Sequence, residues 1–386
     1  MKTGLAAFAA GLFSLTANAE GFRITGTVKA MPDSCIVSLI DTEKGENGKK
    51  IAETVAADDN FTLTGDIASP TLCNLNFGTR MKDGRLRRFA SVPVMLGNDQ
   101  VTVITDKTAE EIGKMSHTET AFTVTGGEAQ RQYQEYVDAC GEADREQEKA
   151  SYLNAMKYFE SNDNPDTMAV YDKIKKDAYN RFAALRDEFV KKHPSYFISA
   201  ALTKQEMLKQ YLYTGDELKA MRKMMKAVPD TARQSMFDRL LDFSLRYCKA
   251  MPCPDFEMTS DGGKVSKLSE IKANGKYTFI DIWASWCGPC RAAIPHVKEL
   301  AQKYGDRLQI MSISVDEEED AWRKAMKEEQ MPWAQYRLAP GDQFNTAGRL
   351  LNISSIPRLI LLNEKGEIVC STNLPKEVTA VIETRL

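Results

Sequence analysis

The chain has 386 residues, 43% of them hydrophobic and 27% charged, and its 51 Lys and Arg against 54 Asp and Glu give a net charge of −3. This balance argues against a nucleic-acid-binding protein and against a basic membrane-surface patch. A chain of this length is too long for one hydrophobic core, so two or three domains are expected. Eight cysteines do not suggest a disulfide-dependent fold, so their positions matter more than their number.

The first residues have the composition of an export signal. Lys2 precedes an apolar stretch from Leu5 to Leu15, and Ala17-Asn18-Ala19 supplies the small residues that a signal peptidase accepts. The apolar stretch is too short to span a bilayer comfortably. We therefore expect residues 1–19 to be a signal peptide cleaved before Glu20, and the mature protein to be exported to a bacterial periplasm.

Residues 20–126 are predicted to form a β-rich domain. Alternation of apolar and polar residues predicts strands at Phe22–Val28 and Asn60–Gly65. Polar turns separate further β-prone segments, which predict strands at Ser34–Leu39, Thr71–Phe77, Ala90–Leu96 and Gln100–Thr105. Many short strands with polar turns indicate a small antiparallel sandwich or barrel. No set of side chains here suggests catalysis, so we expect a folding or interaction module.

Residues 127–250 are predicted to be α-helical. Apolar residues from Tyr171 to Phe189 recur at a helical period and define one amphipathic face. Thr214–Glu217 and Thr231–Gln234 have the pattern of capping boxes, which predicts helix starts at both places. The apolar faces must pack on another part of the chain or on a second copy, so a homo-oligomer is one expected state.

Met251-Pro252-Cys253-Pro254 predicts a domain boundary, because two prolines end a helix and force an extended chain. In residues 251–386, strands and helices then alternate, which indicates a mixed sheet covered by helices. The predicted fold is thus multidomain: an antiparallel β domain, a helical region and a C-terminal α/β domain. The strands expected in the last part are Tyr277–Trp283, Leu308–Ser314, Arg358–Leu362 and Glu367–Cys370, and the helices are Pro289–Tyr304, Glu317–Glu329 and Lys376–Arg385.

A dithiol motif, Trp286-Cys287-Gly288-Pro289-Cys290, lies where a predicted strand gives way to a helix. Cys287 is expected at the helix N-terminus, where unpaired N–H groups and the helix dipole favour a thiolate. Cys287 is therefore the predicted nucleophile and Cys290, one turn further on, the predicted resolving cysteine. Pro289 suits the first helical turn, where its missing N–H is no loss. The only redox group expected is the Cys287–Cys290 disulfide, with no cofactor and no metal.

The segment from Phe279 to Cys290 resembles the active-site segment of thioredoxin-family proteins. Pro254-Asp255-Phe256, the segment around Asp320–Tyr336 and Ile356-Pro357 resemble the periplasmic branch of that family, the TlpA/ResA-like reductases. The resemblance covers about a third of the chain and implies a thioredoxin fold for it. The two preceding parts resemble the N-terminal extension that often comes before such a domain.

The resemblance also implies roles for residues at matching positions. Asp281 matches a buried acid that exchanges protons with the resolving cysteine; burial near two thiols would raise its pKa and suit proton transfer near neutral pH. Pro357 matches a cis-proline beside the active site, where the backbone of Ile356 can hold a substrate peptide. The expected client-binding residues are Trp286, Gly288, Pro289, Ile356 and Pro357.

One departure from the periplasmic branch follows the motif directly. Arg291-Ala292-Ala293 stands where many of these reductases carry a glutamate. The proton relay is then expected to depend on Asp281 alone, and a narrow role in cytochrome maturation is not favoured.

Three other classes of function were weighed. A peroxiredoxin-type peroxidase would need Thr and Pro at the positions of Ala284 and Ile280. A structural zinc site could combine the motif cysteines with Cys248 and Cys253, but a strand-to-helix motif with Trp and Pro favours redox chemistry. A binding module on a thioredoxin scaffold is disfavoured by the intact dithiol.

The direction of exchange is predicted from the residues between the two cysteines. Gly288-Pro289 favours a reductase, with an isomerase or oxidase as the alternative. The partners implied by the resemblance are client proteins with disulfides or thiols and a membrane electron donor such as a DsbD-like reductase.

The remaining cysteines allow several pairings. Cys35 and Cys73 could form a disulfide or remain buried thiols, and Cys248 and Cys253 could close a small loop. Core packing is expected for Cys140 and Cys370. His296 is expected to be a surface or packing residue, because no partner lies at metal-ligand spacing.

Overall fold

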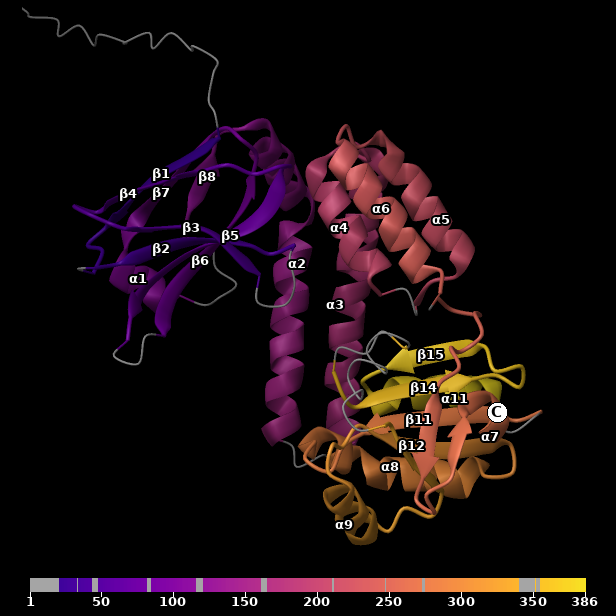
Figure 1. The fold of residues 1–386 in the computed structure, drawn as a ribbon. Helices are drawn as coiled ribbons and strands as arrows, with labels where there is room; N and C mark the ends of the chain where they lie inside the picture. The colour runs from indigo at the N-terminus through magenta and orange to yellow at the C-terminus, as the bar shows by residue number, and fades with distance from the viewer. Residues whose placement is uncertain are drawn as a thin grey trace, which may run out of the picture. The chain divides into compact units, whose positions relative to one another are not determined.

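The structure is a computed structural model that describes residues 21–32, 34–43, 48–81, 85–115, 121–160, 165–209, 212–246, 248–272, 275–339, 351 and 355–386. The predicted signal peptide lies outside these residues. The chain divides into two compact units, Met1–Ala201 and Leu202–Leu386 (Figure 1). The domain boundaries expected near residues 126 and 250 stay predictions.

The first unit begins with a β-sandwich of two four-stranded sheets, in the orders β4-β1-β7-β8 and β3-β2-β5-β6. Apolar residues from both sheets, such as Ile24 and Leu75, are fully buried in one shared core. All neighbouring strands are antiparallel except β1 and β7, so the predicted antiparallel β domain is confirmed. The strands are β1 (Phe22–Lys29), β2 (Ile36–Asp41), β3 (Lys49–Val55), β4 (Asn60–Gly65), β5 (Thr71–Arg80), β6 (Leu86–Leu96), β7 (Gln100–Thr108) and β8 (Thr123–Thr125).

Besides the short strand β8, two elements of the sandwich were not predicted. All residues of the strand β3 are half-exposed or exposed, so its sequence lacks the apolar alternation that predicts a strand. The short helix α1 (Ala109–Lys114) follows β7 directly and begins with a capping box between Thr108 and Glu111. Both depend on neighbours, β3 on its pairing with β2 and α1 on contacts with β6 and β7.

Two long antiparallel helices, α2 (Glu128–Glu160) and α3 (Pro165–Lys192), follow the sandwich, and α4 (Phe197–Met207) comes next. The buried side chain of Gln130 accepts a hydrogen bond from the Met95 N–H at 2.9 Å and so fixes the start of α2 on β6. The predicted apolar face of α3 is only partly buried within this unit. Phe189 is buried near its end, whereas Ile174 is 44% exposed.

The second unit starts with α5 (Gly215–Met224), a short 3₁₀ turn η2 (Met225–Ala227) and α6 (Thr231–Ser244). The capping box predicted at Thr214 and Glu217 is confirmed. The one predicted at Thr231 is wrong, because Asp230 is the N-cap residue and its carboxylate accepts the Arg233 N–H at 2.7 Å. Asp is at least as strong a cap as Thr, and it stands one residue earlier.

The rest of the second unit is a seven-stranded sheet in the order β10-β9-β13-β12-β11-β14-β15. The central pairs β11–β12 and β12–β13 are parallel and the others antiparallel, which confirms the predicted mixed sheet. The strands are β9 (Glu257–Ser260), β10 (Val265–Lys267), β11 (Tyr277–Trp283), β12 (Leu308–Ser314), β13 (Ala334–Arg337), β14 (Arg358–Leu362) and β15 (Ile368–Thr372), and the helices are α7 (Leu268–Ile271), α8 (Gly288–Tyr304), α9 (Glu319–Glu329) and α11 (Pro375–Arg385).

Helices cover both faces of this sheet (Figure 1). Successive residues of a strand point to opposite faces. Phe279 accordingly packs with side chains of α8 and α11, while Ile280 belongs to a core with Trp322 of α9. The sheet is thus buried on both sides, as its nearly continuous apolar central strands require.

The predicted boundary segment runs along the start of β15. Ala250 N–H donates to the Ile368 carbonyl at 2.9 Å, Ile368 N–H to Met251 at 2.8 Å, and Cys253 N–H to Gly366 at 2.9 Å. These bonds join residues 250–253 to the sheet.

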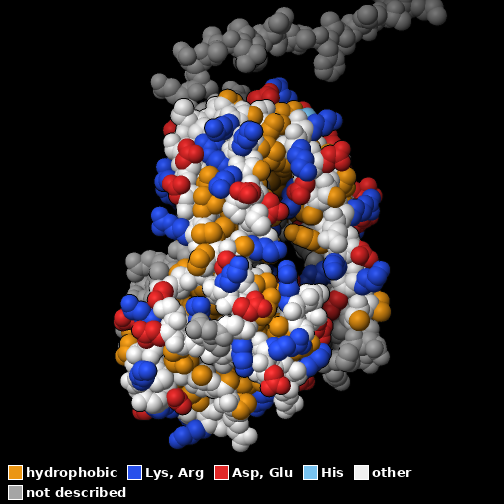
Figure 2. All heavy atoms as spheres, turned by 90° about the vertical axis from the view of Figure 1, so that its right-hand side faces the viewer, with side chains coloured by type: hydrophobic (Ala, Val, Ile, Leu, Met, Phe, Trp, Pro, Cys, Tyr) orange, Lys and Arg blue, Asp and Glu red, His pale blue; other side chains and the backbone are white. Residues whose placement is uncertain are grey.

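Among the described residues, no helix is long and apolar enough to cross a membrane. Figure 2 shows Lys and Arg side chains intermixed with Asp and Glu over the face that is drawn, in keeping with the net charge of −3.

Candidate functional site

The candidate site is the dithiol at the start of α8. Cys287 is the N-cap residue, and its Sγ accepts a hydrogen bond from the Cys290 N–H at 3.2 Å. The two side chains are joined in a disulfide, with their Cα atoms 5.3 Å apart, and both are buried. The helix therefore directs an N–H group at the first sulfur, an arrangement that stabilises negative charge on it.

Exposed residues of the motif surround this buried disulfide. Trp286 is 62% exposed, and Gly288 and Pro289 are also exposed. The peptide bond between Ile356 and Pro357 is cis, and Ile356 packs against the core cluster that contains Cys287 and Cys290. The predicted client-binding residues thus include three exposed positions of the motif, with Ile356 packed near it.

Asp281 lies inside the sheet on β11. It is 2% exposed, and its Oδ2 accepts a hydrogen bond from Ser312 Oγ at 3.0 Å. Burial raises the pKa of Asp281 to about 7, against which the hydrogen bond from Ser312 lowers it. A group that exchanges protons must populate both its protonated and its ionised form at the working pH. A pKa near 7 meets this condition for Asp281 at neutral pH.

The loop before Cys287 is held by a second buried acid, Asp316. Its Oδ2 accepts the Ser285 N–H at 2.8 Å and its Oδ1 accepts the Ser285 hydroxyl at 2.6 Å. The Ser314 hydroxyl adds a third bond, to Oδ2, at 2.7 Å. Ser285 is two residues before Cys287, so Asp316 fixes the backbone that leads into the motif.

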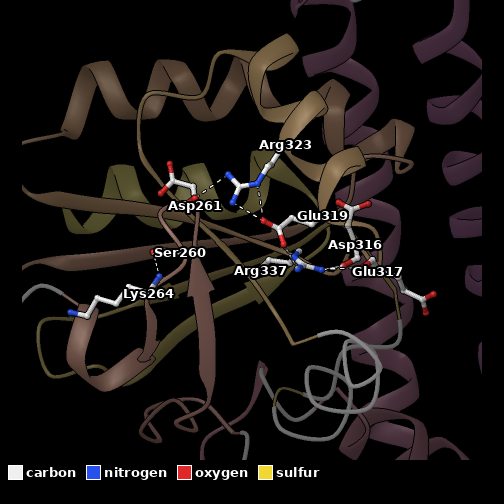
Figure 3. Close-up of polar contacts among 8 residues, drawn as sticks. All are labelled: Ser260, Asp261, Lys264, Asp316, Glu317, Glu319, Arg323 and Arg337. Carbon is white, nitrogen blue, oxygen red and sulfur yellow. Dashed lines mark hydrogen bonds and ion pairs between the residues drawn. The ribbon is translucent and has the colours of Figure 1, made fainter.

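Arg337 of β13 holds the loop that contains Asp316 (Figure 3). Its Nη1 donates to the Glu317 carbonyl at 3.1 Å, and its Nη2 pairs with Glu319 at 3.2 Å. Arg323 pairs with the same Glu319 at 2.7 Å and donates to the Asp261 carbonyl at 3.0 Å. These bonds connect the loop after β12 to α9 and to the turn between β9 and β10.

Arg291 belongs to the Arg291-Ala292-Ala293 segment that departs from the periplasmic branch, and it has two structural partners. It donates to Glu329 at 2.5 Å and to Glu328 at 2.9 Å, and so ties the first turn of α8 to the end of α9.

The six other cysteines are free thiols in the structure. Cys35 and Cys73 are therefore buried thiols, and Cys248 and Cys253 do not close a loop. His296 bonds to Thr379 through Nε2 at 2.5 Å. In the described part of the chain, no group of three or more His, Cys, Asp or Glu is placed to hold a metal ion.

Five residues that support the dithiol motif through hydrogen bonds were not predicted from the sequence: Ser285, Ser312, Asp316, Trp333 and Arg337. The sequence contains a signal for one of these contacts, between Ser285 and Asp316. Ser285 and Asp316 each stand two residues after a predicted strand, and the carboxyl ends of neighbouring parallel strands meet at one edge of a sheet. The partners of Trp333 and Arg337 come from distant segments and have no such signal.

Two parts of the chain match known families. Residues 274–368 match a family described as thioredoxin-like. Residues 22–133 match a domain of unknown function, DUF4369.

Curated relatives match the C-terminal part. The thioredoxin-like protein YneN of Bacillus subtilis is 30% identical over 117 residues, which are 30% of this chain and 65% of the relative. The thiol-disulfide oxidoreductase ResA of Bacillus cereus is 28% identical over 120 residues, 30% of this chain and 64% of the relative. The chain thus spans less than two thirds of the length of these relatives.

A solved structure of the thioredoxin domain of a thiol-disulfide oxidoreductase from Bacteroides vulgatus is 25% identical, with a TM-score of 0.33. The match covers 36% of this chain and 96% of that one.

Proposed function

From the premise that residues 274–368 are a thioredoxin-like domain, we propose that the chain is a thiol–disulfide oxidoreductase acting through Cys287 and Cys290. The observation that carries the proposal is the buried dithiol pair at the N-terminus of α8, with the Cys290 N–H directed at the Cys287 sulfur. A thiolate at such a position is both stabilised and reachable by a partner disulfide.

In the reducing direction, the reaction has two exchange steps. The Cys287 thiolate attacks one sulfur of a client disulfide, forms a mixed disulfide and releases the first client thiolate. The Cys290 thiolate then attacks the Cys287 sulfur, releases the second client thiolate and leaves the Cys287–Cys290 disulfide. The client gains two electrons and, from the enzyme and solvent, two protons.

Asp281 is proposed to take the proton of Cys290 before the second step and to return one when the disulfide is reduced again. Its pKa of about 7 supports this role, because the acid can then hold or release a proton near neutral pH. Its complete burial keeps that proton from exchanging freely with solvent.

The client is proposed to lie across Trp286, Gly288, Pro289, Ile356 and Pro357. The exposure of the first three supports this, since a folded client needs surface beside the attacked sulfur. Clients are proteins with disulfides or thiols. Net reduction requires a two-electron donor, for which a membrane DsbD-like reductase in the periplasm is proposed.

The proposed location is the periplasm, after removal of residues 1–19. The export pattern of Lys2, the apolar stretch and Ala17-Asn18-Ala19 supports this. N-terminal sequencing of the exported protein tests it, with Glu20 as the expected first residue and Met1 as the contrary result.

The function is tested by the reduction of insulin with dithiothreitol as donor. Cys287→Ser is expected to abolish the accelerated reduction, and Cys290→Ser to accumulate mixed disulfides with clients. Cys370→Ser, a partly buried free thiol on β15, is the matched control and is expected to retain full activity. If Cys287→Ser keeps its activity, or if only Cys287→Ser traps clients, the assigned roles are wrong.

A further inference from the structure

Three side chains form a hydrogen-bond chain that ends at the buried acid. The Trp333 indole Nε1–H donates to Ser312 Oγ at 2.8 Å. Ser312 Oγ in turn donates to Asp281 Oδ2 at 3.0 Å. Ser312 and Asp281 are directly paired on β12 and β11, and both are buried.

The direction of this chain follows from what each group can donate. An indole nitrogen has a proton and accepts no hydrogen bond, so Ser312 Oγ must be the acceptor of the Trp333 bond. The hydroxyl has one proton of its own, and among the described residues its remaining partner is Asp281. A protonated Asp281 can still accept this proton through its unprotonated oxygen, but a hydrogen bond to the ionised carboxylate is stronger.

We propose that Ser312, oriented by the indole N–H of Trp333, is a positioning residue that keeps a hydroxyl proton directed at the Asp281 carboxylate. This arrangement favours the ionised form of an acid that burial would otherwise keep protonated. It therefore sets the pH range over which Asp281 can accept a proton from Cys290. That consequence rests on the proposed function, whereas the effect on Asp281 itself does not.

Burial and the hydrogen bond from Ser312 have opposite effects on the ionisation of Asp281. Burial raises the pKa of Asp281 and the hydrogen bond from Ser312 lowers it, while no charged side chain contributes among the described residues. A hydrogen bond to a charged group in such a site is among the stronger ones in proteins. Among the described residues, Ser312 is thus the side chain whose hydrogen bond favours the ionised form of Asp281.

The free thiols of Cys253 and Cys370 do not compete for a proton near neutral pH. Burial raises the pKa of Cys253 to about 12 and that of Cys370 to about 11. On β14, Arg358 is paired with Ile282, the residue after Asp281, and it donates to Asn373 at 2.7 Å. The thiols of Cys287 and Cys290, at the start of α8, do not titrate in the disulfide form.

Trp333 comes from the loop between α9 and β13, in the segment that the resemblance associates with the periplasmic branch. It is partly buried and packs against both core clusters of the domain. Packing on both sides fixes the indole ring, so its N–H stays directed at Ser312 Oγ. The loop thereby acts on the acid without contacting it.

The proposal is tested by titrating the Asp281 carboxyl group in the oxidised full-length protein, with ¹³C-carboxyl aspartate observed by NMR and assigned by Asp281→Asn. Ser312→Ala is expected to raise the Asp281 midpoint by roughly one to two pH units. Trp333→Phe, which keeps the ring and removes the N–H, is expected to raise it by a smaller amount. An unchanged midpoint in a folded Ser312→Ala protein overturns the proposal.

Two further variants separate positioning from a loss of packing. Trp322→Phe is the matched control, because Trp322 belongs to the core against which Trp333 packs but its Nε1 has no hydrogen-bond partner in the described chain. It is expected to leave the midpoint unchanged. Trp333→Phe is expected to add no shift to Ser312→Ala, since it acts only through the hydroxyl. A full additional shift contradicts this route.

If Ser312→Ala fails to fold, the Trp333→Phe and Trp322→Phe pair still decides the matter. Equal midpoints in the two variants reject the role of Trp333. The function is read separately, from the pH dependence of client release by the reduced protein. A shifted Asp281 midpoint without any exchange activity would reject the proposed function and retain this inference.

Discussion

Ser285 and Asp316 are joined by two hydrogen bonds, one from the Ser285 backbone N–H at 2.8 Å and one from its hydroxyl at 2.6 Å. A carboxylate that accepts both donors of one residue fixes the backbone and the side chain together. Because Ser285 precedes Cys287 by two residues, this pair determines how β11 leads into the N-terminus of α8.

Asp316→Ala is therefore expected to impair the site as well as the fold. It leaves the buried donors of Ser285 and Ser314 without an acceptor, which should cost about 2–4 kcal/mol of stability. It should also slow disulfide exchange, since the loop before the nucleophile is released. Thermal unfolding and insulin reduction measure the two effects. Asp320→Ala, an exposed acid in the first turn of α9, is the control. Wild-type behaviour of Asp316→Ala would show that the loop is held by other contacts.

All four tryptophans of the chain lie between Trp283 and Trp333, so their fluorescence reports unfolding of the C-terminal domain selectively. This makes the stability of that domain measurable in the full-length protein.

The pKa of Asp281, raised to about 7 from an ordinary 3.8, predicts a pH-dependent stability. Well below pH 3.8 the acid is protonated in the folded and unfolded chains alike, so it has no effect. As the pH rises towards 7, the unfolded chain releases a proton that the folded chain keeps, and the folded state becomes relatively less stable.

Asp281→Asn removes this penalty. The variant should be more stable than the wild type above pH 7, by at most about 4 kcal/mol, and the difference should fall below about 1 kcal/mol near pH 4. The melting temperature of the oxidised proteins, followed by tryptophan fluorescence between pH 4 and 8, checks this. A difference that is constant across this range would mean that Asp281 titrates normally.

Much of the site could be predicted because its residues are adjacent in sequence. Cys287, Gly288, Pro289 and Cys290 are one motif, and the end of a β-prone run places them at a helix start. The network that supports them joins residues far apart in the sequence, such as Ser312 and Asp281 or Ser285 and Asp316, which are 31 positions apart in each case. Such pairs depend on strand register, which a single sequence does not specify.

The same reason explains the missed strands. β9, β10 and β13 have three or four residues each, and partners rather than propensity define them. The long central strands β11 and β12 were predicted with their observed bounds, because they are buried on both faces and rich in apolar, β-prone residues. At α6 the pattern suggested the wrong cap, since Asp230 stands next to an equally plausible Thr231.

We propose that residues 251–386 form an independent domain, and a fragment from Lys249 to Leu386 tests this. It keeps the bonds of Ala250, Met251 and Cys253 to the start of β15. It is expected to fold and to reduce a small model disulfide as fast as the full chain does.

A fragment from Pro254 loses those three backbone bonds and should be less stable by about 2 kcal/mol. A fragment from Leu202, which contains the whole second compact unit, is the control. If only the fragment from Leu202 is active, the helices α5 and α6 belong to the catalytic domain and the proposed boundary is wrong.

The reduction potential of the Cys287–Cys290 pair tests the central claim most directly. The full-length protein is equilibrated with dithiothreitol or glutathione buffers, alkylated, and the fraction of the pair in the disulfide form is determined by mass spectrometry. The account predicts a two-electron transition nearer to about −270 mV, as in thioredoxin, than to about −120 mV, as in strong oxidants. A potential above roughly −180 mV would contradict a reductase and favour an isomerase or oxidase, and a pair that does not titrate at all would contradict the oxidoreductase itself.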